Sequence, residues 1–86
     1  MGKYEWRKLM SGDWELLLPS RTKLKVTNKY TSGWNAWADT FDYDFLFQTN
    51  ETYDTPEEAK RAIIEVARAQ MRHDLEILDT FDNAGA

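Results

Sequence analysis

The sequence lacks cysteine, and it contains one histidine, two prolines and four glycines. Without cysteine, no disulfide bond can stabilise the fold, so packing must stabilise a chain of 86 residues that is near the lower size limit for an adequate core. The absence of cysteine is typical of a reducing compartment. No internal repeat, low-complexity tract or linker divides the chain, which predicts a single domain over residues 1–86.

Long apolar runs are also missing, since none approaches the ~20 residues of a membrane-spanning helix. The first residues, MGKYEWRKL, lack the apolar centre of a signal peptide. We therefore expect a cytoplasmic protein that has no membrane partner.

Hydrophobic residues make up 42% of the chain and aromatic residues 14%, including four tryptophans, which indicates a folded domain. The net charge is -4, but the charges are unevenly distributed. Residues 1–30 contain seven Lys and Arg against three acids, whereas residues 31–58 contain seven acids and no base. The overall balance argues against generic nucleic-acid binding and points to local charged surfaces instead.

One long helix is predicted from Thr55 to Asp79. Thr55 suits the N-cap, Pro56 suits the first helical position, and Glu58 completes a capping box. One apolar face of this helix is expected to cover the core. A second apolar stripe, Ile64, Met71, Leu75 and Leu78, lies beside the first. We expect its C-terminal part, Met71, Leu75 and Leu78, to extend past the sheet and to stay exposed in a monomer. The stripe would then mediate a homodimer, unless Phe81 or the first hairpin covers it.

Alternating patterns predict strands between residues 4 and 48, namely 4–9, 14–18, 21–30 and 34–39, with 41–48 as either a fifth strand or a bulged continuation of the fourth. The aromatic residues of 41–48 alternate with acids and are expected to face the core. The predicted fold class is α+β: an antiparallel four- to five-stranded β-meander (about 4–48), covered on one face by a single long C-terminal α-helix (about 55–79) and followed by a flexible tail (80–86).

Basic residues share one face of the third predicted strand: Arg21, Lys23, Lys25 and Lys29. This face is expected to meet solvent. Such a stripe could follow a phosphate backbone, which makes a small nucleic-acid-binding protein the alternative function. The competing interpretation is cross-strand charge neutralisation by acids on neighbouring strands.

The acidic stretch supplies the predicted surface for a basic protein partner: Asp39, Asp42, Asp44, Glu51 and Asp54. The D-x-x-D-x-D spacing of the first three also offers oxygen ligands to a divalent cation, but it lacks the glycine and distal glutamate of a calcium loop, so a solvated face is the favoured interpretation. We expect no metal and no cofactor.

The single histidine and two of the tryptophans could serve either function or packing. The single histidine, His73, falls near the core face of the predicted helix without a partner nucleophile, which favours a packing or contact role and a protein that is not an enzyme. Trp34 and Trp37 are three residues apart, so in a regular strand they face opposite sides, and one of them should lie outside the core as part of a contact surface.

From Trp6 to Leu78, a tryptophan-rich meander is followed by a T-P-E-E-A-K helix. In this order of elements the chain resembles small acidic accessory proteins of bacteriophages and prophages, including anti-defence inhibitors such as anti-CRISPR proteins. The resemblance implies a protein-binding inhibitor without naming its target. The expected function is therefore a non-enzymatic protein-binding module, with nucleic-acid binding through Arg21–Lys29 as the alternative.

Overall fold

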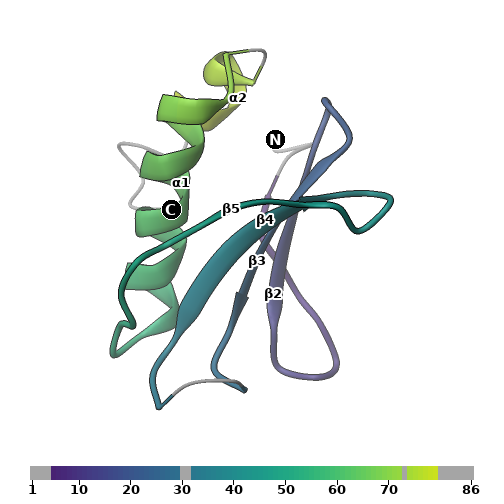
Figure 1. The fold of residues 1–86 in the computed structure, drawn as a ribbon. Helices are drawn as coiled ribbons and strands as arrows, with labels where there is room; N and C mark the ends of the chain where they lie inside the picture. Colours follow the sequence, from purple (N-terminus) through teal and green to yellow (C-terminus); the bar gives the residue numbers. More distant parts are fainter. Residues whose placement is uncertain (1–4, 30–31, 73, 80–86) are drawn as a thin grey trace.

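The computed structural model describes residues 5–29, 32–72 and 74–79. A five-stranded antiparallel sheet has the strand order β1-β2-β3-β4-β5, so the predicted meander is confirmed (Figure 1). The strands are β1 (Arg7–Lys8), β2 (Trp14–Leu18), β3 (Thr22–Thr27), β4 (Asn35–Thr40) and β5 (Phe45–Gln48). The segment 41–48 is therefore not a continuation of β4, because a turn separates the two strands.

Helix α1 (Pro56–Gln70) begins as predicted. The side-chain oxygen of Thr55 accepts the backbone N–H of Glu58, and the Glu58 carboxylate accepts the N–H of Thr55, both at 3.2 Å. This reciprocal capping satisfies two donors that the first helical turn leaves unpaired. Glu57 and Glu58 add negative charge at the positive end of the helix dipole.

The prediction of a single long helix is wrong, because α1 ends at Gln70 and Met71 adopts an extended conformation with φ -121°. A short helix α2 (Leu75–Asp79) follows and packs against α1 (Figure 1). Asp74, between the helices, is buried and accepts a hydrogen bond from Ser20 in the β2–β3 turn. Tertiary packing thus overrides helical periodicity, since the break lets Leu78 enter the core.

The core lies between α1 and one face of the sheet (Figure 1). It is formed by side chains of β2, β3, β4 and both helices: Leu16, Leu18, Leu24, Val26, Ala36, Ala38, Ala59, Ile63, Ile64, Ala67 and Leu78. The residues in register across the strands, such as Leu16, Leu24 and Ala38, share this covered face. We call the opposite side, which α1 does not cover, the open face.

The predicted tail 80–86 and His73 lie outside the described residues. Within the described part of the chain, no helix combines the length and the apolar character that crossing a membrane requires.

Candidate functional site at strand β5

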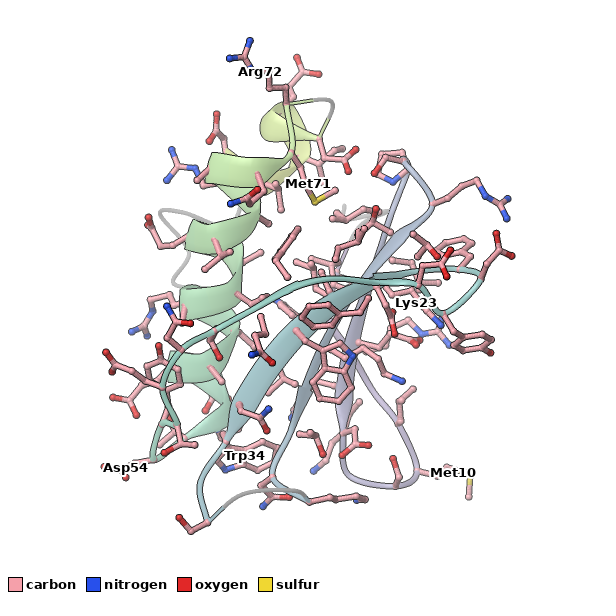
Figure 2. All side chains as sticks on the ribbon, in the orientation of Figure 1. Met10, Lys23, Trp34, Asp54, Met71 and Arg72 are labelled. Atoms are coloured by element: carbon pink, nitrogen blue, oxygen red, sulfur yellow. The ribbon has the colours of Figure 1, made fainter. Side chains whose placement is uncertain are left out.

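Large apolar side chains are exposed at one place in the sheet. Among the described residues, the exposed large hydrophobic side chains are Met10, Tyr43, Phe45 and Leu46. Met10 lies in the β1–β2 turn (Figure 2). The other three are close in sequence, in the β4–β5 turn and in β5. We call Tyr43, Phe45 and Leu46, with the neighbouring Asp42 and Asp44, the β5 surface.

The β4–β5 turn is held by Thr40. Its hydroxyl accepts the backbone N–H groups of Asp42 and Asp44 at 3.2 and 3.1 Å, and its backbone N–H donates to the Asp44 carbonyl at 2.9 Å. Within this turn Tyr43 has φ +70° and a side chain that is 77% exposed. A bulky residue is disfavoured in the left-handed region by about 1–2 kcal/mol, where glycine would cost little. The turn therefore presents an aromatic ring to solvent at an energetic cost.

Two basic side chains from β3 and the preceding turn lie under the aromatic rings of this turn. The Lys23 Nζ lies 4.1 Å from the centre of the Tyr43 ring, and the Arg21 guanidinium lies 5.4 Å from the centre of the Phe41 ring. The Arg21 carbonyl also accepts the backbone N–H of Phe41 at 3.0 Å. These contacts join the β2–β3 turn to the β4–β5 turn and position Tyr43 over the open face.

The prediction that the basic face of the third strand meets solvent is wrong at Lys23, because this residue is only 9% exposed. In the strand register Lys23 is opposite Asp39, which is also 9% exposed, and Asp39 is opposite Phe45. The predicted cross-strand neighbourhood of base and acid is thus present. The Oδ1 atom of Asp39 nevertheless has no hydrogen-bond partner among the described residues, because Lys23 is directed to the Tyr43 ring instead.

The basic residues predicted to follow a phosphate backbone do not form an uninterrupted exposed stripe. Lys23 is covered, and Lys25 is half-buried between its strand neighbours. Lys29 lies 3.5 Å from Asp13 and donates to the Ser11 carbonyl at 2.5 Å. Arg21, at φ +65°, is exposed next to Phe41. The nucleic-acid alternative stays a prediction that this arrangement does not favour.

Lys29 belongs to a small polar cluster between the β1–β2 turn and the end of β3. Thr27, which is buried, donates its hydroxyl to the Asp13 carboxylate at 2.7 Å. Burial alone would raise the pKa of Asp13, but the hydrogen bond from Thr27 and the nearby Lys29 ammonium hold this pKa below its ordinary value of 3.8. The cluster ties the β1–β2 turn to the end of β3.

The five predicted acidic residues do not form one cluster. Asp42 and Asp44 are exposed in the turn before β5, and Glu51 and Asp54 are exposed in the segment after it. Asp54 lies near the start of α1, on the side of the molecule away from Lys23 (Figure 2). Asp39 is buried and contributes little to an outer surface. The acids therefore mark both ends of β5.

Most described residues of the helical stripe that was predicted for self-association pack in or against the core. Ile64 is 3% exposed and Leu78 is fully buried, so the expectation that Leu78 stays exposed in a monomer is wrong. Met71 is half-buried and packs on the core between the helices and the sheet (Figure 2). The side chain of Leu75 lies outside the described residues. The homodimer itself stays a prediction, but the described part of the stripe no longer requires it.

Sequence reasoning did not anticipate a buried lysine on the inner face of α1. Lys60 is 5% exposed, and its Nζ lies 3.4 Å from the centre of the Trp14 ring and 5.7 Å from that of Trp6. Burial lowers the pKa of Lys60, and the Glu57 carboxylate one turn earlier partly opposes this change. Because both tryptophans are half-buried and pack against the core, we assign this arrangement to the packing of the fold.

Trp34 and Trp37 take different positions. Trp34 packs against the core and exchanges two backbone hydrogen bonds of 2.7 Å with Tyr53. Trp37 is half-buried and shares the open face with Lys25 and Gln48, its neighbours in the strand register. Trp37 is therefore the one outside the core.

Among the described residues, no three acidic or histidine side chains come together in a way that could hold a metal ion. Comparison of the chain with models of protein families, with curated proteins and with solved structures finds no match. Among the described residues, the outstanding surface feature is the group of exposed apolar side chains in the β4–β5 turn and β5.

Proposed function

We propose that the chain is a non-enzymatic protein-binding module that uses the β5 surface to occupy part of another protein. The observation that carries this proposal is Tyr43, an exposed ring at φ +70° in a turn that Thr40 holds in place. Unfavourable backbone conformations persist where the surrounding structure enforces them, and they are concentrated at functional sites. Exposed aromatic residues in a fixed turn are also suited to act as anchors in an interface.

The adjoining residues extend the aromatic anchor into a larger surface. Phe45 is 59% exposed and Leu46 is 43% exposed, directly after the turn. Large exposed apolar side chains that are grouped together and bordered by polar residues often mark an interaction site. In agreement with the resemblance to phage accessory proteins, we propose an inhibitor or accessory protein that acts in a bacterial cytoplasm.

The test is a comparison of captured proteins from a bacterial lysate. The binding variant is Tyr43→Ser with Leu46→Ser, and the matched control is Met10→Ser, which removes an exposed apolar side chain far from β5. We expect the wild type and the control to capture the same protein, and the double variant to lose it while still unfolding cooperatively on heating. Equal capture by all three chains would contradict the proposal.

Oligonucleotide titrations distinguish the alternative function. Binding that weakens steeply with salt and that the double variant leaves unchanged would favour nucleic acid as the partner. The basic residues Arg21 and Lys25 would then be the first positions to reverse in charge.

A further inference from the structure

One backbone edge of strand β5 pairs with no other described strand. In the described part of the chain its only neighbouring strand is β4, and it lies last in the sheet. Leu46 is the extra residue of a β-bulge, since Phe47 pairs with Ala38 and Phe45 pairs with Asp39. The bulge turns Phe45 onto the open face, whereas Phe47 packs on the core.

The hydrogen bonds to β4 show which backbone groups of β5 face outward. Thr49 donates its N–H to a β4 carbonyl at 3.0 Å, and the Asp44 carbonyl accepts a β4 N–H at 2.9 Å. Residues of an antiparallel pair alternate between those that bond to the neighbour and those that do not. The backbone N–H groups of Phe45 and Gln48 therefore point away from β4. They lie on either side of the bulge.

Charge at the two ends of β5 selects the kind of chain that can pair with this edge. Asp42 and Asp44 precede the strand, and Glu51 and Asp54 follow it, all of them exposed. If a second copy paired antiparallel through β5, the acids before one strand would face the acids after the other, which is unfavourable. A segment with an apolar centre and basic residues at both ends meets opposite charges instead.

Resting on the proposed function, we propose that the β5 surface binds an extended segment of another protein by strand addition, with basic residues flanking a short apolar centre. The segment pairs with the outward peptide groups of Phe45 and Gln48 and becomes a sixth strand. In this mode backbone hydrogen bonds supply affinity, and side-chain contacts supply specificity. Phe45 and Tyr43 supply these contacts on the open face.

The probe is a synthetic peptide in which alternating valine and threonine residues lie between two pairs of lysines. It is titrated into the isotope-labelled full chain, and amide resonances are followed by NMR. We expect shifts confined to β5 and the β4–β5 turn at peptide concentrations up to about 1 mM. The same peptide flanked by glutamates should bind more weakly, and a peptide with N-methylated valines should lose binding.

Two variants separate backbone pairing from side-chain contact. Gln48→Pro removes an outward N–H that β4 does not use, and proline is tolerated at sheet edges, whereas Gln48→Thr keeps the N–H as the matched control. We expect Gln48→Pro to weaken peptide binding about fivefold, the equivalent of one net hydrogen bond, and Gln48→Thr to leave it nearly unchanged. The unfolding midpoints of both variants verify that the sheet stays intact.

The outcomes distinguish failure of this inference from failure of the proposed function. If Tyr43→Ser weakens binding but Gln48→Pro and N-methylation do not, strand addition is overturned and side-chain docking on the same surface stands. Equal binding of the lysine- and glutamate-flanked peptides overturns the basic partner. Absence of any β5 shift at about 1 mM peptide overturns strand addition, whereas the lysate comparison decides the proposed function independently.

Discussion

The two edges of the sheet are built differently. At one edge, β1 consists of Arg7 and Lys8, both charged and exposed. At the other edge, β5 has the sequence Phe-Leu-Phe-Gln and exposes two large apolar side chains. Short, charged edges are a common means of preventing unwanted strand pairing. The β1 edge has this protection and β5 has only a bulge, which is why we interpret β5 as the edge kept available for a partner.

The largest expected effect tests whether the apolar residues of β5 serve stability. Leu24→Ala, in the core, should lower the free energy of unfolding by about 3 kcal/mol, because it leaves a cavity where the side chain is fully buried. Leu46→Ala should cost about 1 kcal/mol or less, because that side chain is 43% exposed. Chemical denaturation measures both. A comparable loss for the two variants would mean that Leu46 is structural.

A second prediction concerns a variant in which β5 carries charged residues, as β1 does. Phe45→Lys with Leu46→Lys should weaken binding of the lysine-flanked peptide by more than about thirtyfold, or ~2 kcal/mol, since it removes contacts and adds repulsion. The neutral control, Phe45→Thr with Leu46→Thr, should lose less. Calorimetric titration compares the variants, and unchanged affinity in the lysine variant would remove β5 from the binding site.

A third prediction concerns the polar cluster between the β1–β2 turn and the end of β3. Asp13→Asn should lower the free energy of unfolding by about 1–2 kcal/mol at neutral pH, because it removes a charged acceptor for Thr27 and the partner of Lys29.

The pH dependence of this contribution follows from the direction of the pKa shift. The folded pKa of Asp13 lies below 3.8, so the stabilisation is present above that pH and is lost as the pH falls through the folded value. Denaturation at several acidic pH values checks this. Parallel pH profiles for the wild type and Asp13→Asn would contradict the assigned role.

The start of the helix and the order of the strands follow from local sequence, whereas the end of the helix does not. Thr55, Pro56 and Glu58 act within one turn, so their capping pattern is visible in the sequence. No glycine or proline near Met71 marks the end of the helix in the sequence. The break is associated with the contact between Asp74 and Ser20, which are 54 residues apart in the chain.

Only the acidic residues of the candidate site could be predicted from the sequence. Asp42 and Asp44 were expected at the surface and are exposed. Tyr43 and Phe45 were expected to face the core with the other aromatic residues of 41–48, but both are exposed. Tyr43 is in a turn, and the bulge at Leu46 shifts the alternation by one residue, so Phe45 changes face. A single inserted residue of this kind leaves no clear compositional signal.

The smallest expected effect on stability is at Tyr43. Tyr43→Gly removes the ring over Lys23 but also relieves a positive φ that glycine adopts readily. Since an exposed cation–π contact contributes about 0.5–1 kcal/mol, the two effects should nearly cancel, and the free energy of unfolding should change by no more than about 0.5 kcal/mol. Thermal unfolding tests this, and a large loss would make Tyr43 a structural residue.

Amide hydrogen exchange at β5 tests the central claim most directly. With free peptide at about ten times Kd, the outward amides of Phe45 and Gln48 should exchange about tenfold more slowly, because they become donors to the added strand. The amides of Arg7 and Lys8, at the other edge, should be unaffected and serve as internal controls. Binding of the lysine-flanked peptide with unchanged exchange at Phe45 and Gln48 would contradict the account.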